Sequence, residues 1–276
     1  MISAMLRGVV RRAATLPLQA VSAGMRAQAL ERLTAGMVSE TTVNGAALRF
    51  HAPSVLLRER AANLATKEPD MLPWLDRLGP DDVLWDVGAN IGVFTVYAAA
   101  ARQCRVLAFE PAAANYAVLA RNLQLNAVTD RATAYCLALA GETALRALNL
   151  YSEEPGAALS HFGVVGETSR YSEQRATLSH GMVGFTIDDF IAHFNPPRPT
   201  HLKMDVDGLE LPILLNAEAA LSDRRLASVM VELSLTRRDE RQQAIDFLSA
   251  RGLRLAAAGD PQGAAEQAAN HLFVRA

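Results

Sequence analysis

The sequence predicts an α/β protein with a mostly parallel sheet that helices cover on both faces. Two observations indicate this fold class. Short apolar runs of strand length alternate regularly with longer segments of helical periodicity. The apolar runs are continuous, as expected for parallel strands that are buried on both faces. The chain has 276 residues, of which 50% are hydrophobic and 20% are charged, so it is long enough to bury one large core.

The expected elements follow one another in a regular order. Residues 41–53 predict a hairpin, because Asn44-Gly45 supplies a turn with positive φ between two strand-like flanks. Residues 54–78 are expected to be mostly helical, with a break near Pro69. Strands are then expected at residues 82–87, 104–109, 132–139, 201–206, 227–233 and 253–258. Helices are expected at residues 92–102, 112–126, 187–194, 209–221 and 238–251.

Two further segments bear on the sheet and on ligand binding. Residues 270–276 form a short apolar strand that is expected to join the edge of the sheet antiparallel. Residues 152–184 are rich in Gly, Ser and Glu, and they are too many for a plain connector. An irregular stretch of this length is usually a binding loop, a lid or a disordered segment. We interpret it as the substrate-side loop.

The N-terminal segment differs from the rest of the chain in its charge. Residues 1–30 contain four arginines and no acid, although the whole chain has a net charge of −2. We therefore separate a basic amphipathic arm (residues 1–35) from a main domain (residues 36–276) that opens with a hairpin and helical extension (residues 36–80). The pattern of residues 1–16 suits peripheral contact with an anionic membrane. Packing of the arm on its own domain, or on a twin subunit of a homo-oligomer, is the alternative.

The composition argues against several classes of protein. A slightly acidic chain lacks the basic face of a nucleic-acid-binding protein. Cys104 and Cys136 have neither the spacing of a zinc site nor the number and spacing of a disulfide framework. We therefore expect two free thiols in a reducing compartment. No run approaches the roughly 20 apolar residues that a spanning helix needs. We expect a cytoplasmic protein, of which only the arm is suited to the inner face of the membrane.

The stretch LWDVGANIGVFT (residues 84–95) predicts a ligand-binding loop. Asp86 and Val87 end an apolar strand, Gly88 and Gly92 leave the backbone free of side chains, and a helix begins directly afterwards. Ligands of open α/β sheets bind beyond the carboxyl ends of the strands. The positive end of the helix favours an anionic group there, either a phosphate or a carboxylate.

Spacing and charge distinguish between these two ligands. The loop lacks the middle glycine of the dinucleotide motif G-x-G-x-x-G, and the carboxylate of Asp86 repels a phosphate but attracts an ammonium group. Glu110 ends the next strand, where a carboxylate can accept both hydroxyls of a ribose. A ribose, an amino-acid group and no phosphate together describe S-adenosylmethionine.

The chain resembles the FkbM-type methyltransferases in the order of its motifs, which are DVGANIGVFT, AFEP, NLQLNAV, FTIDDF, HLKMDVDGLELPILLNAEAAL and VMVEL. The resemblance covers residues 40–275. It implies a class I Rossmann-like fold with a seven-stranded sheet, S-adenosylmethionine as the cofactor, and methylation of a hydroxyl on a sugar, glycan or secondary metabolite. Where the family commonly has D-V-E-G-A-E, this chain has Asp207 and Leu209, so the acceptor pocket is expected to depart from the family more than the donor site.

The resemblance also implies roles for individual residues. The implied donor-binding residues are Asp86, Val87, Gly88, Asn90, Gly92, Glu110, Pro111, Ala138, Leu139 and Asp205. Ala138 and Leu139 end the third strand and are expected to flank the adenine, with simple core packing as the alternative. Lys203 precedes Asp205 by two residues, and we interpret it as one partner of a structural ion pair.

Methylation of a hydroxyl needs assistance, because a hydroxyl is a poor nucleophile. Asp205, Glu232 and His161 are the catalytic candidates, and Asp205 is the first because its strand end faces the methyl group. We expect no resident metal, although Asp205, Asp207 and Glu210 offer the oxygen ligands that magnesium prefers. Stabilisation of a helix start is the simpler interpretation of Asp207 and Glu210.

Two other functions remain open on the sequence. An NAD(P)-dependent oxidoreductase uses the same sheet architecture, but the missing middle glycine counts against it. A non-catalytic scaffold would bind the donor without turnover. The expected acceptor is a small molecule or a glycan, and no motif identifies it further.

Overall fold

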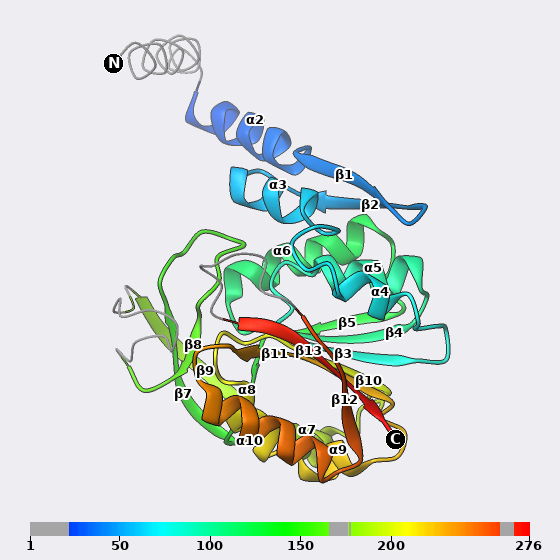
Figure 1. Cartoon of the computed structure of the whole chain (residues 1–276). Coiled ribbons are helices and arrows are strands. Elements are labelled where there is room, and N and C mark those ends of the chain that lie inside the picture. The colour runs from blue at the N-terminus through cyan, green and yellow to red at the C-terminus, as the bar shows by residue number, and fades with distance from the viewer. Residues whose placement is uncertain (1–21, 166–175, 177, 260–267) are drawn as a thin grey trace, which may run out of the picture.

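The computed structural model describes residues 22–165, 176, 178–259 and 268–276, and a seven-stranded sheet lies at its centre (Figure 1). The strands occur in the order β12-β13-β11-β10-β3-β4-β5. They are β3 (Val83–Val87), β4 (Arg105–Phe109), β5 (Ala132–Tyr135), β10 (His201–Met204), β11 (Ser228–Ser234), β12 (Leu253–Ala258) and β13 (Ala268–Arg275). Neighbouring strands are parallel except where β13 takes part. The predicted fold class is confirmed.

The antiparallel strand lies one place away from its predicted position. We expected it at the edge of the sheet, but β13 lies between β11 and β12. Burial explains the difference, because Leu272 and Phe273 are buried in the cores on opposite faces of the sheet. By contrast, β12 exposes every residue after Leu253 and forms the edge.

Helices cover both faces of this sheet (Figure 1). One face carries α4 (Met71–Leu75), α5 (Val93–Ala101) and α6 (Ala113–Leu125), and the other carries α7 (Ile187–Phe194), α8 (Glu210–Leu215), α9 (Glu218–Ser222) and α10 (Arg238–Ser249). Alternation along β3 separates the two cores, since Leu84 faces the first while Trp85 and Val87 face the second. Both faces are therefore closed, and ligands can approach only at the ends of the strands.

One predicted helix is divided. Residues 209–221 form α8 and α9, because the carboxylate of Asp188 accepts the backbone N–H groups of Ala219 and Ala220 and thereby starts a new helix. The helix α8 is therefore short, and it begins directly after the loop that follows β10.

A second, four-stranded sheet was not predicted. Its order is β6-β9-β7-β8. The strands are β6 (Ala138–Leu139), β7 (Ala144–Leu150), β8 (His161–Gly163) and β9 (Leu178–Phe185). The strand expected at 132–139 is thus two strands in two sheets. The stretch 152–184, which we interpreted as irregular, contains β8 and all of β9 except its last residue. The strand β9 was missed because it contains glycine, which is uncommon in strands. Gly184 is needed there, since the ring of Phe162 occupies the position where a Cβ would lie.

The N-terminal extension packs on the face that carries α5 and α6. The predicted hairpin forms as β1 (Val38–Val43) and β2 (Ala46–His51), with Asn44 at a φ of 48°. The helical stretch continues as α3 (Val55–Ala62) and α4, with the expected break between them.

Ahead of the hairpin, α2 (Ala23–Ala35) buries none of its residues. The division between arm and domain stays a prediction, and the membrane contact predicted for residues 1–16 lies outside the described residues. No helix within the described ranges is both long and apolar enough to cross a bilayer.

Candidate active site

The loop after β3 is held between the ends of two neighbouring strands. Gly88 has a φ of +78°, and a Cβ at this position would stand 1.7 Å from the backbone oxygen of Asp205. Only glycine meets both conditions. The N–H groups of Gly88 and Ala89 donate to the carbonyl of Phe109 at 3.0 and 3.1 Å. The bare backbone of Gly88 is therefore presented at the carboxyl ends of β3, β4 and β10, where a ligand loop is expected.

Asn90 and Gly92 complete the loop in different ways. Asn90 has a φ of 51° and lines the pocket described below. A Cβ at Gly92 would stand 2.2 Å from Cδ1 of Leu119, so the packing of α5 against α6 requires this glycine. Gly92 is not among the residues that line the pocket, and the structure does not support its predicted contact with the donor.

Asp86 is a buried ion-pair partner. Asp86 is 1% exposed to solvent. Its Oδ1 lies 3.1 Å from Nζ of Lys203, and its Oδ2 accepts a hydrogen bond from the hydroxyl of Thr95 at 2.5 Å. Lys203 also donates to the carbonyl of Gly88 at 3.2 Å. The structural ion pair predicted for Lys203 is confirmed. The contact predicted between Asp86 and the ammonium group of the donor stays a prediction, and in this structure the charge of Asp86 is already matched by Lys203.

Glu110 follows β4 and presents its carboxylate to the pocket. Oε2 accepts the N–H of Asn90 at 2.8 Å, and Oε1 accepts the N–H of Ala112 at 2.9 Å. Burial raises the pKa of Glu110 to about 7, although these hydrogen bonds act in the opposite direction. Because an ionised carboxylate offers about four acceptor positions, it keeps the capacity to accept a hydroxyl group. The position suits the predicted ribose contact.

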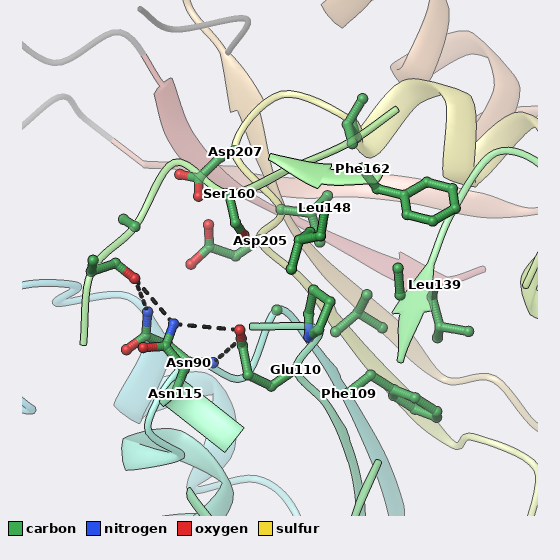
Figure 2. Close-up of a pocket in the computed structure, with 18 of the residues that line it drawn as sticks. Asn90, Phe109, Glu110, Asn115, Leu139, Leu148, Ser160, Phe162, Asp205 and Asp207 are labelled. Carbon is green, nitrogen blue, oxygen red and sulfur yellow. Dashed lines mark hydrogen bonds between the residues drawn. The ribbon is translucent and has the colours of Figure 1, made fainter. Parts of the chain in front are cut away.

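The pocket opens between the donor loop, the ends of β10 and β11 and the second sheet (Figure 2). Its lining includes the predicted residues Val87, Gly88, Asn90, Glu110, Pro111, Ala138, Leu139, Asp205 and Glu232. Figure 2 shows Phe109 and Leu139 on one side of Glu110 and the carboxylates of Asp205 and Asp207 on the other. The first side suits a flat apolar ring, and the second suits polar chemistry.

One wall of the pocket comes from the stretch 152–184, which we interpreted as the substrate-side loop, but the way in which it is held was not predicted. We call residues 156–160 the bridging segment, because side chains from opposite walls hold its two ends. Asn115 accepts the N–H of Gly156 at 2.7 Å and donates to the carbonyl of Ala157 at 3.1 Å. Asp207 accepts the N–H of Leu159 at 2.6 Å. Sequence reasoning missed Asn115 because a single asparagine within a helix carries no motif signal.

Two of the three catalytic candidates lie in the pocket. Asp205 has its Oδ2 3.8 Å from Nζ of Lys203. The negative charge of Asp205, followed by burial, raises the pKa of Glu232 to about 9. Glu232 therefore carries a proton at neutral pH and can donate a hydrogen bond.

His161 is placed differently from the other two candidates. It is 7% exposed at the start of β8, and its chain neighbours Ser160 and Phe162 line the pocket while His161 does not. Side chains alternate between the two sides of an extended chain, so His161 faces away. The structure does not support His161 as a base.

The carboxylates of Asp207 and Glu210 accept hydrogen bonds from backbone N–H groups. Oε1 of Glu210 accepts the N–H groups of Val206 and Gly208 at 3.0 and 3.2 Å, which stabilises the turn before α8. Burial raises the pKa of Glu210 to about 7 and that of Asp207 to about 6. In the described part of the chain, no three His, Cys, Asp or Glu side chains are grouped to hold a metal ion.

The chain matches the model of the methyltransferase FkbM domain over residues 86–255, from the donor loop to β12. It belongs to the FkbM methyltransferase family. Methyltransferase 1 of Beauveria bassiana is 29% identical over 174 residues, which are 59% of this chain and 68% of that protein. The hexuronic acid methyltransferase AglP of Haloferax volcanii is 27% identical over 203 residues, which are 74% of this chain and 77% of AglP.

Solved structures show looser similarities. The methyltransferase FkbM from Methylobacillus flagellatus has a TM-score of 0.49 at 17% identity over 72% of this chain, which corresponds to 44% of that chain. The protein TYW2 of M. jannaschii, solved in complex with AdoMet, has a TM-score of 0.43 at 11% identity and covers 87% of each chain. Membership of the FkbM family, taken with the pocket residues, supports S-adenosylmethionine as the cofactor of this methyltransferase.

Proposed function

We propose that the protein transfers the methyl group of S-adenosylmethionine to a hydroxyl group of a sugar, a glycan or a secondary metabolite. The position of Glu110 carries this proposal. Its carboxylate lies at the end of the strand next to the Gly88 loop, bonded to the N–H of Asn90 at 2.8 Å, in a chain of the FkbM family. A ribose at Glu110 would extend an adenine toward Leu139 and a thioether chain across Gly88.

The donor would be held by groups of opposite character. Leu139 and Phe109 would pack against the adenine, and the carboxylate of Glu110 would accept the ribose hydroxyls. When bound, the cofactor supplies an electrophilic methyl group on a positively charged sulfur. The protein contributes alignment and exclusion of water, which together lower the barrier of an in-line displacement by several kcal/mol.

The acceptor would be handled by the carboxylates on the other side of the pocket. Asp205 lines the pocket at the end of β10, and its backbone carbonyl lies against Gly88. Its carboxylate would take the hydroxyl proton while the acceptor oxygen forms its new bond to the methyl carbon and the carbon–sulfur bond breaks. Glu232, protonated at neutral pH, would donate a hydrogen bond to a second oxygen of the acceptor. A carbohydrate, which carries several neighbouring hydroxyls, matches this pair.

The relative AglP is named for a hexuronic acid, and this makes sugar acids a sensible first class of acceptor. At 27% identity the name does not transfer to this chain. Neutral sugars therefore belong in the same panel, and so do hydroxylated secondary metabolites.

The test is transfer of a radiolabelled methyl group from S-adenosylmethionine to this panel. Alkaline hydrolysis of the product separates a methyl ether, formed on a hydroxyl, from a methyl ester, formed on a carboxylate. Asp205→Asn should slow transfer by about 100-fold or more at saturating S-adenosylmethionine, the usual contribution of a general base. Glu59→Gln, an exposed change on α3, is the matched control. Full activity of Asp205→Asn would refute Asp205 as the base.

A further inference from the structure

Arg60 brings a half-buried cation into the pocket. It lies in the last turn of α3, and its Nε donates to the carbonyl of Gly156 at 3.0 Å, which holds the guanidinium at the start of the bridging segment. A guanidinium has five N–H donors, so its two Nη groups keep donors that have no acceptor in the described part of the chain. No carboxylate lies within ion-pair distance of Arg60 among the described residues. Because a half-buried charge is costly without a counter-charge, this position suits an anionic group of a ligand.

The other charges around the pocket make Arg60 the main site for such an anion. The pocket is lined by four acidic and two basic side chains, which are Glu110, Asp205, Asp207, Glu232, Arg60 and Lys67. Lys67 is exposed, whereas Arg60 is half-buried and presents the planar fork that pairs with a carboxylate through two hydrogen bonds. A carboxylate that entered the pocket would therefore be repelled by the acids and attracted chiefly to Arg60.

The charge of Arg60 reaches the side of the pocket that we assign to the acceptor. Burial and the charge of Asp205 raise the pKa of Asp207 to about 6. The charge of Arg60 acts on this pKa in the opposite direction, so the guanidinium lies within electrostatic range of Asp207. The bridging segment makes the same connection, because it meets Arg60 at Gly156 and is bonded to Asp207 near its other end.

Ser160 presents an uncharged polar group on this side. It lines the pocket, and Figure 2 shows it with Asp205 and Asp207. Its hydroxyl has no hydrogen-bond partner among the described residues. The preceding residue, Leu159, has a φ of 69°, which a leucine adopts only where its surroundings hold it, and Asp207 accepts its N–H at 2.6 Å. Ser160 is therefore set in place to meet a hydroxyl group of a ligand.

We propose that the acceptor is a sugar acid and that Arg60 determines this specificity by pairing with its carboxylate. Ser160 would bond to one hydroxyl of the sugar, and the hydroxyl that reacts would lie at Asp205. As its oxygen bonds to the methyl carbon, the carbon–sulfur bond breaks and the proton passes to Asp205, while the carboxylate of the sugar stays unchanged. The inference rests on the proposed function and narrows its acceptor to one chemical class.

The anion at Arg60 has a second candidate source, since the methyl donor also carries a carboxylate. Arg60 borders a smaller cavity beside the donor loop as well as the pocket. A contact with the donor would appear in the affinity for S-adenosylhomocysteine alone, whereas a contact with the acceptor would appear only in methyl transfer. Both quantities are therefore measured on the same variants.

Matched glycosides measure the acceptor preference. Para-nitrophenyl β-glucuronide and β-glucoside differ only in whether the sugar carries a carboxylate or a hydroxymethyl group, and the galacturonide and galactoside form a second pair. At saturating S-adenosylmethionine, wild-type protein should show a kcat/KM about 10- to 100-fold higher for the acid of at least one pair, the usual contribution of a hydrogen bond to a charged group. This comparison needs no variant.

Variants assign the preference to Arg60. Arg60→Met should remove it, so that the acid and the neutral sugar of the pair react at similar kcat/KM, and Arg60→Lys, which keeps the charge but not the fork, should retain part of it. Arg254→Met, which removes a charge from the exposed strand β12, should keep the full preference. Calorimetric titration of Arg60→Met with S-adenosylhomocysteine should give an affinity within about threefold of wild type.

The outcomes separate the two proposals. If wild-type protein does not bind S-adenosylhomocysteine, the proposed function fails. If it binds this ligand but methylates both members of each pair equally, or none of the glycosides, the sugar-acid assignment is overturned while the donor function stands. A large loss of S-adenosylhomocysteine affinity in Arg60→Met would place the carboxylate of the donor at Arg60 and overturn the assignment too. A methyl ester as the product would do the same, since a carboxylate paired with Arg60 is not the nucleophile.

Discussion

Replacing Lys203 by methionine removes the positive charge that neutralises Asp86. The two residues are 2% and 1% exposed, and the salt bridge between them spans 3.1 Å. Burial by itself would lower the pKa of Lys203, but the carboxylates of Asp86, Asp205 and Glu68 outweigh it and raise that pKa. Lys203 is therefore charged throughout the neutral range, and the pair stays intact there.

In the variant, the buried carboxylate keeps one hydrogen-bond partner among the described residues, the hydroxyl of Thr95 at 2.5 Å. Breaking a buried pair in this way costs about 3–5 kcal/mol. For a chain of this size each kcal/mol lowers the midpoint of thermal unfolding by about 2–4 °C, so a decrease of roughly 6–20 °C is expected. Differential scanning calorimetry measures it directly.

A second variant identifies the cause of the deficit. The double variant Asp86→Asn/Lys203→Met should recover part of the loss at neutral pH, because no charge remains buried. A decrease of less than about 2 °C at pH 7 for the single variant would refute the reasoning, as would a double variant no more stable than the single one.

Three further predictions follow from the same geometry. Gly88→Ala places a Cβ 1.7 Å from the oxygen of Asp205 at a φ of +78°, so unfolding in urea should show a loss of about 3 kcal/mol or more; an unchanged midpoint would contradict this. Because burial raises the pKa of Glu110 to about 7, the ionised form that accepts ribose hydroxyls is lost as the pH falls through 7, and affinity for S-adenosylhomocysteine should decline up to about tenfold per pH unit below it. Glu110→Gln should flatten that profile, and a profile identical to wild type would count against the ribose contact. Asp207→Ala removes the acceptor of the Leu159 N–H, so hydrogen exchange at this amide should accelerate about 10- to 100-fold; unaltered protection would show that the bridging segment is held in another way.

The donor loop could be predicted from the sequence because its constraints are local. Gly88 must be a glycine because its φ is positive and because the backbone oxygen of Asp205, at the end of β10, lies where a Cβ would stand. Both constraints therefore show in the sequence as a glycine directly after an apolar strand. Glu110 follows its strand directly, so its place at the carboxyl edge of the sheet is fixed as soon as the strand is recognised. The family resemblance then implied a seven-stranded sheet.

Pairing between distant strands could not be predicted in the same way. Lys203 and Asp86 are register partners on β10 and β3, and no local signal shows that these two strands lie side by side. The sequence therefore presented Asp86 as a ligand group. The same limit applies to β9, where Gly181 and Gly184 interrupt the strand pattern, and to Asn115, whose function depends on a segment far along the chain.

The central claim, that the Gly88 loop and Glu110 hold an adenosyl methyl donor, is tested most directly by calorimetric titration of the purified chain. The ligands are S-adenosylmethionine, S-adenosylhomocysteine and NADH. We expect saturable binding of the two adenosyl compounds and none of NADH. Binding of NADH without either adenosyl compound would contradict the claim and favour an oxidoreductase, and the absence of binding by all three would contradict a preformed donor site.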